Sequence, residues 1–346
     1  MSELTNAFAS RGWNVRLVTV AGTHSDFYSL RTGIDRVALN NSGESGSFLV
    51  AFARNWERIR RLRQAVTTFN PDSVLVFGAR TNVLTLIALT GISIPVVVSE
   101  RTDPFALNIG FPWHHLRPWI YRRAAKVVAQ TERVAGKIKE TWSLSNLEVI
   151  PNPLPNELQK FLQFNSDREK LLISVGRLSR EKGHDILLDA WALVKDEFPD
   201  WRLRLVGDGP ERNRLESQAL RLGLGNCMEF AGQTQSVWAE YISARVFVLP
   251  SRREGFPNAL LEALACGCIC VASDCNSGPA EILKNGEFGV LYEPNSAENL
   301  AGALRNALRQ TVGAANLDFA KKVRNQYRIN TIMDQWSSVL TKVDQT

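Results

Sequence analysis

Residues 171–183 read Leu-Leu-Ile-Ser-Val-Gly-Arg-Leu-Ser-Arg-Glu-Lys-Gly, and a segment with helical periodicity follows them. An apolar run of strand length that ends in a glycine-containing turn before a helix is typical of one step in a parallel β-sheet. Similar steps occur on both sides of this stretch. The pattern therefore predicts an α/β protein built from doubly wound parallel sheets.

Nine further strands are expected from the same kind of apolar run. They cover Val15–Val20, Ser73–Phe77, Val96–Ser99, Val127–Ala129, Leu147–Ile150, Arg202–Val206, Met228–Phe230, Val246–Leu249 and Cys268–Ala272. The proline-rich stretch 151–155 cannot form a helix and is expected to join two domains. We therefore expect an N-terminal domain over 1–150, a linker over 151–168, a C-terminal domain over 169–325, and a final helix over 326–346 that returns towards the N-terminal domain.

The size and composition of the chain agree with two globular domains. Its 346 residues leave room for two cores, and 45% hydrophobic with 22% charged residues excludes disordered and collagen-like chains. The net charge is +6, and the basic excess lies in the first half: residues 1–155 hold 18 Lys and Arg against 11 Asp and Glu, whereas residues 156–346 hold 23 against 24. An anionic partner is expected for the first half, such as a membrane surface, a phosphorylated substrate or nucleic acid.

The cysteines and the apolar segments indicate the cellular compartment of the protein. Five cysteines without a signal-peptide pattern indicate a reducing cytoplasm. Cys268 and Cys270 alternate in an expected strand, and no zinc-like spacing follows, so buried thiols are expected and no metal site. The most apolar stretch, 83–98, contains Thr, Gly, Ser and Pro, and does not reach the ~18 apolar residues of a membrane span.

The start of the sequence differs from that of an ordinary doubly wound domain. Residues 1–11 have the pattern of a helix that leads into the strand Val15–Val20. Such a domain normally opens with a strand and a glycine-rich turn. We therefore expect that the first strand of the N-terminal sheet is missing from this sequence.

Two turns in the second half have the composition of a phosphate site. Gly176 follows an expected strand, and Arg177 and Lys182 add positive charge before the next helix begins. The Gly207-Asp208-Gly209-Pro210 turn follows the next strand. Glycine turns and helix N-termini at strand ends bind anions. The alternative is a basic turn that pairs with nearby acids, and the G-x4-G-K-[ST] pattern of a P-loop is not present.

A third strand end carries two carboxylates. Glu254 lies in the loop after Val246–Leu249, and Glu262 lies more than a turn inside the helix that follows Pro257. Eight residues of helix span ~12 Å, more than the separation of the paired carboxylates in a glycosidase. The two residues fit hydroxyl groups at opposite ends of a polyhydroxylated ligand better. The alternative for each is a solvated charge.

Together these motifs resemble glycosyltransferase family 4, a retaining family with the GT-B fold, in which two Rossmann-like domains face each other across a cleft. The Gly-Arg-Leu-x-x-Glu-Lys-Gly loop, the Gly-Asp-Gly-Pro turn and the Glu-x7-Glu motif match the family in order and spacing. The resemblance implies that Arg177, Lys182 and Glu254 are catalytic, the two cations holding the diphosphate and Glu254 the transferred sugar. It also implies a donor-binding set of Gly176, Gly207, Asp208, Gly255, Phe256, Pro257, Asn258, Ala259, Leu260 and Glu262, in which Glu262 binds the ribose.

The resemblance also implies a mechanism without metal or cofactor. Fixed cations and backbone amides stabilise the charge on the departing diphosphate, and a diphosphate oxygen accepts the acceptor's proton. Many family members carry a histidine after the strand Val96–Ser99, where this sequence has Arg101. The Ser99-Glu100-Arg101 sequence is similar to a subgroup from capsule, exopolysaccharide, lipopolysaccharide and lipid-linked glycan pathways. Arg101 is expected to bind the acceptor, because an arginine suits an acceptor phosphate or hydroxyl; it cannot act as a base.

The resulting expectation is a retaining transferase that moves a hexosyl or N-acetylhexosaminyl unit from a nucleotide-sugar, on family grounds UDP-linked, to a cell-surface or lipid-linked glycan. The alternatives are a truncated, catalytically silent nucleotide-sugar binder and a GT-B nucleotide-sugar epimerase. Nucleic acid is not expected, since no nucleic-acid motif is found.

The basic first half adds an expectation of peripheral contact with the inner face of the cytoplasmic membrane. The predicted helix Phe48–Val66 carries Arg54, Arg58 and Arg61 at helical spacing, and Phe111–Trp119 combines aromatic with basic residues. A solvated surface helix is the alternative.

Overall fold

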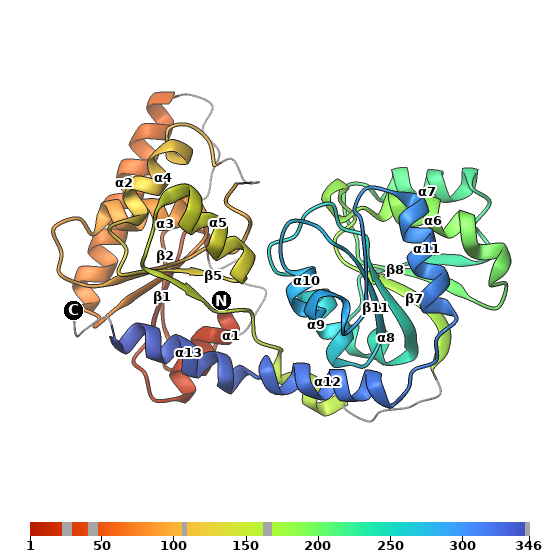
Figure 1. The fold of residues 1–346 in the computed structure, drawn as a ribbon. Helices are drawn as coiled ribbons and strands as arrows, with labels where there is room; N and C mark the ends of the chain where they lie inside the picture. The colour runs from red at the N-terminus through yellow and green to blue at the C-terminus, as the bar shows by residue number, and fades with distance from the viewer. Residues whose placement is uncertain (23–29, 41–47, 106–108, 162–167, 343–346) are drawn as a thin grey trace. The chain divides into compact units, whose positions relative to one another are not determined.

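The computed structural model describes residues 1–22, 30–40, 48–105, 109–161 and 168–342, with only the backbone described at 48–52, 159 and 160. The chain forms two compact units (Figure 1). The N-terminal unit comprises Met1–Pro151 with Ile329–Thr346, and the C-terminal unit comprises Asn152–Arg328. The chain therefore passes between the units next to Pro151 and next to Arg328, whereas the sequence placed the boundaries at residues 150 and 325.

The N-terminal unit contains two parallel sheets. A four-stranded sheet follows chain order: β3 (Val74–Phe77), β4 (Val96–Ser99), β5 (Lys126–Ala129) and β6 (Leu147–Val149). A separate pair joins β1 (Arg16–Thr19) to β2 (Asp35–Ala38). The five strands expected in this half are confirmed to within two residues. β2 was not expected, because its sequence Asp-Arg-Val-Ala is short and half polar.

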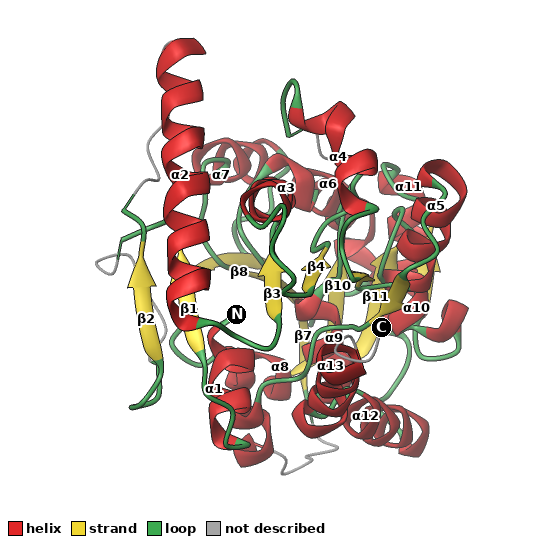
Figure 2. Ribbon diagram, turned by 90° about the vertical axis from the view of Figure 1, so that its left-hand side faces the viewer, coloured by secondary structure: helices red, strands yellow, loops and turns green. Residues whose placement is uncertain are grey.

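One edge of β1 and one edge of β3 have no partner strand in the described residues. β1 pairs only with β2, and β3 pairs only with β4 (Figure 2). The apolar residues of β3 are only partly buried apart from Val76, whereas every residue of β4 is buried. The described residues place no strand between β1 and β3.

Helices cover both faces of the four-stranded sheet, because its strands are apolar on both sides. α1 (Ser2–Ser10) and α13 (Ile329–Lys342) pack on one face around Trp336, which is fully buried against Val97 and Val128. The other face carries α3 (Ala79–Ala88), α4 (Trp113–Tyr121) and α5 (Glu132–Trp142). α2 (Phe48–Phe69) packs beside α3.

The C-terminal unit has a six-stranded parallel sheet in the order β12-β11-β10-β7-β8-β9. The strands are β7 (Glu169–Val175), β8 (Arg202–Val206), β9 (Met228–Gly232), β10 (Ala244–Leu249), β11 (Ile269–Ser273) and β12 (Val290–Tyr292). The five strands expected here are confirmed. The three-residue β12 was not expected, because its apolar run is too short to be recognised.

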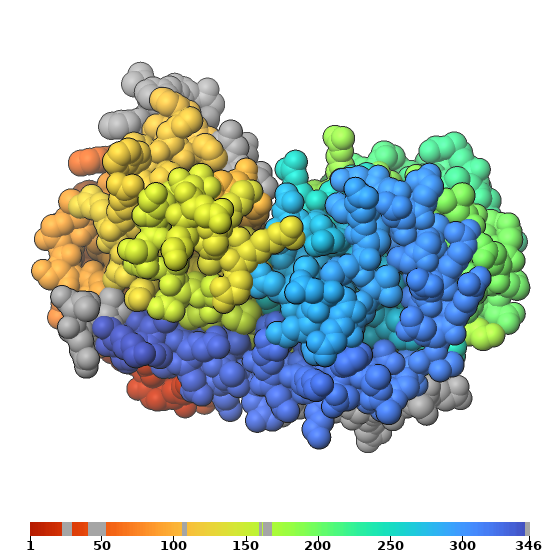
Figure 3. All heavy atoms as spheres, in the orientation of Figure 1, coloured from red at the N-terminus to blue at the C-terminus, as the bar shows by residue number. Residues whose placement is uncertain are grey.

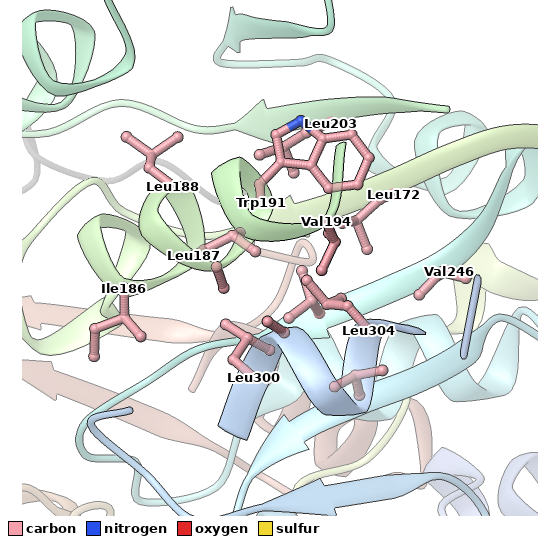
Figure 4. Close-up of a cluster of buried hydrophobic side chains, with 14 of the residues drawn as sticks. Leu172, Ile186, Leu187, Leu188, Trp191, Val194, Leu203, Val246, Leu300 and Leu304 are labelled. Carbon is pink, nitrogen blue, oxygen red and sulfur yellow. The ribbon is translucent and has the colours of Figure 1, made fainter. Parts of the chain in front are cut away.

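The helices of this unit also lie on both faces of the sheet. They are α6 (His184–Val194), α7 (Arg212–Arg221), α8 (Val237–Ser243), α9 (Asn258–Ala265), α10 (Pro279–Ile282), α11 (Ala297–Leu308) and α12 (Ala314–Gln326). Trp191 of α6 is fully buried in one core, which includes Leu300 and Leu304 of α11 (Figure 4). α9 is part of the core on the other face.

The cysteines take the buried positions that their spacing predicted. Cys266, Cys268, Cys270 and Cys275 are buried and free, and Cys227 is partly buried and free. Burial raises the pKa of the Cys268 thiol to about 11, so this thiol stays protonated at neutral pH. These cysteines act as small apolar core residues.

None of the described helices combines the length and the apolar composition that a membrane span requires.

Candidate active site

The candidate site begins at the point where the C-terminal sheet reverses its winding. From β7 the chain builds towards β8 and β9, and it then returns to place β10 on the other side of β7. The loops that follow β7 and β10 therefore leave the carboxyl edge of the sheet side by side. Ligands of open α/β sheets bind at this kind of reversal.

The two loops are joined by an ion pair between expected catalytic residues. Lys182 Nζ lies 2.7 Å from Glu254 Oε1, and the hydroxyl of Ser251 donates to the same oxygen over 2.6 Å. The Glu254 side chain is only 8% exposed and that of Lys182 29%. A largely buried carboxylate is thus held in place by a cation and a hydroxyl. Ser251 was not singled out in the sequence.

Arg252 also contacts the loop that carries Lys182. The backbone N–H of Arg252 donates to the Glu181 carbonyl over 2.8 Å, and its guanidinium donates to the Arg180 carbonyl over 2.8 Å. The same guanidinium makes a bidentate pair with Asp185 at 2.7 and 2.8 Å. Burial raises the pKa of Asp185, but the hydrogen bonds and charge of Arg252 outweigh it and hold that pKa below its usual value.

Two glycines permit the loops to approach each other. Gly207 has φ +135°, and a Cβ there would collide with the Gly176 carbonyl oxygen. Gly183 has φ +68°, and a Cβ there would collide with the Pro250 carbonyl oxygen. Only glycine meets both requirements, a positive φ and the close backbone contact.

A hollow of about 570 Å³ opens beside the glycine turn. Its lining residues are Arg177, Gly207, Asp208, Gly209 and Gln233. Arg177 is exposed, so its charge is accessible from this hollow, and the Asp208 carboxylate accepts the Gly209 N–H over 2.7 Å. Sequence reasoning missed Gln233. Its position three residues after the predicted strand Met228–Phe230 was the available signal, because other side chains of the site also follow strand ends.

The N-terminus of α9 lies in the loop after β10. The N–H groups of Asn258 and Ala259 are in the first turn, where a helix supplies no internal acceptor. Phe256 and Leu260 have buried side chains, at 8% and 0% exposure. The Leu260 N–H already donates to the Pro257 carbonyl over 3.1 Å. The anion-binding capacity of this turn therefore rests on the amides before Leu260.

Several expected donor residues have structural contacts. Pro257 is the N-cap of α9 and lies against Gly278, and the Gly255 carbonyl accepts from Ser277 over 3.1 Å. Asn258 Oδ1 accepts from the Asn152 amide over 2.7 Å. These contacts tie the loop between β10 and α9 to neighbouring parts of the C-terminal unit.

Glu262 lies inside α9, as expected, with a tyrosine as its partner. The Tyr241 hydroxyl donates to Glu262 Oε2 over 3.1 Å. Burial raises the pKa of Glu262 to about 7, and the tyrosine's hydrogen bond opposes that rise only in part. Glu262 is consequently poised to titrate near neutral pH.

The N-terminal unit holds the expected acceptor residue. Arg101 follows β4, with its guanidinium carbon 5.1 Å from the ring centroid of Phe77. Burial lowers the pKa of Arg101 to about 10, so it remains charged at neutral pH. The neighbouring Glu100 is fully buried in an ion pair with Arg117.

Family models match both units of the chain. The glycosyl transferase 4-like domain matches residues 1–153, and the glycosyl transferases group 1 domain matches residues 156–326. The chain belongs to the group 1 glycosyltransferases. This glycosyltransferase is 26% identical to an uncharacterized glycosyltransferase of Haemophilus influenzae, over 98% of this chain and 94% of that one.

A second relative has a more informative name. It is the N-acetylgalactosamine-N,N'-diacetylbacillosaminyl-diphospho-undecaprenol 4-alpha-N-acetylgalactosaminyltransferase of Campylobacter jejuni, 28% identical over 68% of this chain and 67% of that one. Among solved structures, Anabaena HepE in complex with UDP and glucose superimposes with a TM-score of 0.75, at 19% identity, over 98% of this chain and 94% of that one. The fold of this glycosyltransferase is GT-B.

Proposed function

We propose that this glycosyltransferase moves a hexosyl or N-acetylhexosaminyl unit from a nucleotide-sugar, UDP-linked, to a lipid-linked or cell-surface glycan, with retention of configuration. The observation that carries the proposal is the contact between Lys182 and Glu254 at the reversal of the C-terminal sheet. The contact supports the assignment of Lys182 to a phosphate and of the adjacent Glu254 carboxylate to a sugar hydroxyl.

Arg177 and Lys182 are assigned to the diphosphate. As the bond from the anomeric carbon to the diphosphate oxygen breaks, its electron pair remains on that oxygen, where both cations and the amides of Asn258 and Ala259 stabilise it. The acceptor oxygen forms its bond on the same face of the sugar, and its proton passes to the departing oxygen. Two cations fill the role of a divalent ion in this scheme, so it requires none.

The remaining donor contacts follow the chemistry of the side chains. Glu254 accepts hydrogen bonds from hydroxyl groups of the transferred sugar, and Glu262 accepts them from the ribose. Both assignments rest on the ability of a carboxylate to accept several hydrogen bonds. Gly176, Gly207 and Asp208 form the turns beside the hollow next to Arg177.

The acceptor is assigned to the N-terminal unit. Arg101 supplies a charge for an acceptor phosphate or a donor for a hydroxyl, in the manner of the Ser-Glu-Arg subgroup. The Campylobacter relative is named for a diphospho-undecaprenol acceptor, which supports a lipid-linked glycan at the inner face of the cytoplasmic membrane. The excess of basic residues in 1–155 suits such an anionic acceptor.

The test is a transfer assay on the purified chain with UDP-sugars and a polyprenyl-diphosphate-linked acceptor. Proton NMR of the product reports its anomeric configuration, and a chelator arm checks the role of divalent ions. Transfer with retention that survives chelation supports the proposal. Binding of UDP-sugar without transfer or hydrolysis would favour a silent nucleotide-sugar binder, and isomerised UDP-sugar an epimerase.

A further inference from the structure

Helix α4 buries an arginine and exposes large apolar side chains, which is unusual for a surface helix. Arg117 and Tyr121 point into the N-terminal unit and are 0% exposed. Phe111, just before the helix, is 82% exposed, and Leu116 and Trp119 on its outer face are 41% and 68% exposed. A helix in water normally places such residues the other way round.

The inward contacts show that this orientation is built in. Arg117 and Glu100 form an ion pair in which both side chains are 0% exposed, and the Tyr121 hydroxyl donates to the same carboxylate. Asn82 donates to the Tyr121 oxygen over 3.0 Å. Rotating α4 would leave buried charges unpaired, which is strongly unfavourable. The outer face is therefore held outward.

The outer face gathers exposed apolar side chains. Phe111, Leu116 and Trp119 are three of seven large hydrophobic residues that are exposed in the described parts of the chain. Leu116 and Trp119 are three residues apart and thus neighbours on the helix surface. The segment is gold in Figure 3, at the surface of the N-terminal unit. We call the outward-facing side chains of residues 111–123 the α4 surface.

The segment that carries the α4 surface has basic residues and no acidic ones. Residues 104–131 contain no Asp or Glu, and Arg122 and Arg123 are exposed. The Arg122 guanidinium carbon lies 4.8 Å from the Trp119 ring centroid. Arg80 donates to the Ile109 carbonyl over 3.2 Å, two residues before the exposed aromatic. Aromatic and arginine side chains with no carboxylate between them are suited to the headgroup region of an anionic bilayer.

The basic helix α2 fits this role less well than its sequence indicated. Arg61 Nη1 donates to the Leu39 carbonyl over 2.9 Å and pairs with Glu57, and Arg63 Nη1 donates to the Ala88 carbonyl over 2.8 Å. These arginines hold the helix to the rest of the unit. Arg58 is buried, and burial together with the charges of Arg80 and Arg54 lowers its pKa.

We propose that the α4 surface docks into the headgroup region of an anionic lipid bilayer, with Phe111 and Trp119 inserted and Arg122 and Arg123 on lipid phosphates. The inference deepens the proposed function and rests on it, because a lipid-linked acceptor is presented at that surface. A symmetric dimer through this face would instead bring two sets of arginines together without acidic partners.

The experiment measures co-sedimentation of the full chain with vesicles of phosphatidylglycerol and phosphatidylcholine, and with phosphatidylcholine alone, at low and high ionic strength. We expect binding to the anionic vesicles that weakens with salt. F111S/W119S and R122Q/R123Q are each expected to weaken it about tenfold or more. The matched controls are L220S, at a leucine that is 81% exposed on α7, and R221Q beside it. They should bind like the unchanged chain.

The depth to which Trp119 inserts is measured with brominated phosphatidylcholine added to the vesicles. Tryptophan quenching should fall in W119F while binding persists. The proposal is overturned if the unchanged chain ignores anionic vesicles, if F111S/W119S binds as well as the controls do, or if equilibrium sedimentation shows a dimer that F111S/W119S dissociates. Binding of UDP-glucose is measured by calorimetry without vesicles, and both double variants should retain it. This measurement distinguishes a failure of membrane docking from a failure of the proposed function.

Discussion

The Nζ atom of Lys182 and the Oε1 atom of Glu254 lie 2.7 Å apart, although the two residues are 72 positions apart in the chain. The contact joins the loop after β7 to the loop after β10. Because these strands are neighbours at the reversal of a parallel sheet, the fold itself brings the two residues together. A cation and a carboxylate of the candidate site thus act as one unit.

Substitution of either member should therefore reduce transfer far more than it reduces stability. For E254Q and for K182A we expect the transfer rate to fall by about 10²- to 10³-fold, since the proposed function assigns each group to charge or hydroxyls in the transition state. Initial rates at saturating donor measure the effect. K170A is the control, because Lys170 pairs with the exposed Asp200 at 2.9 Å. Equal losses in K170A and K182A would contradict the assignment.

Arg252 should act by positioning the Lys182 loop. In R252Q the bidentate pair with Asp185 is lost, and we expect the transfer rate to fall by about tenfold, since small misplacements of catalytic groups are costly. R253Q is the matched control, because Arg253 is exposed beside it. A double-mutant cycle of R252Q with D185N, followed by donor KM and kcat, should show strongly non-additive losses. Additive losses would show that the pair does not position the loop.

The close approach at Gly207 predicts a stability effect. G207A places a Cβ against the Gly176 carbonyl at φ +135°, and should lower the free energy of unfolding by about 2 kcal/mol or more. G225A is the control, because no atom lies within 4 Å of a Cβ at that position. Denaturant unfolding of both variants measures the difference. A G207A chain as stable as G225A would show that the two turns separate easily.

The sequence predicted the long apolar strands and the order of the motifs because buried parallel strands are continuously apolar. It missed β2 and β12, which are short and lie beside polar residues. It could not show that Lys182 contacts Glu254, since strand order decides which loops meet. Nor could the sequence show that Arg252 and not Arg253 contacts Asp185, because side-chain direction in an irregular loop follows no regular period. The same reason left Ser251 and Gln233 unnoticed.

Helix α2 shows a different limit of the sequence. The spacing of Arg54, Arg58 and Arg61 correctly indicated a helix, but spacing does not tell a solvated cation from one that holds a carbonyl. Arg61 binds the Leu39 carbonyl, 22 positions away, and such a partner has no local signal. On α4 the inward direction of Arg117 likewise depends on a distant partner, the buried carboxylate of Glu100.

The buried pair beneath α4 should be sensitive to the loss of one member. R117M leaves the Glu100 carboxylate buried without its cation, and should lower the free energy of unfolding by about 3–5 kcal/mol. R117M/E100Q removes that charge too and should recover part of the loss. Denaturant unfolding of the two variants tests this. A double variant less stable than R117M would show that the carboxylate is satisfied without Arg117.

Glu262 gives the chain a pH dependence of stability. Burial raises its pKa from 4.5 to about 7, so the folded chain binds a proton there more tightly than the unfolded chain does. This group's contribution to stability is therefore present below the usual pKa and is lost as pH rises towards about 7. Unfolding of E262Q should lack this component. The ionisation of Glu262 should also affect the binding of the donor.

Donor affinity should rise with pH through the same range. If Glu262 binds the ribose as proposed, a ribose hydroxyl donates to the ionised carboxylate better than to the protonated acid, so binding favours the ionised form. Calorimetry with UDP-glucose suits the measurement, because its diphosphate diester does not titrate near neutrality. Affinity should increase between about pH 6 and pH 8 in the unchanged chain and remain flat in E262Q. Y241F removes the hydrogen bond that lowers the Glu262 pKa, and should move the midpoint to higher pH. An unchanged midpoint in Y241F, or a slope that persists in E262Q, would assign the titration to another group.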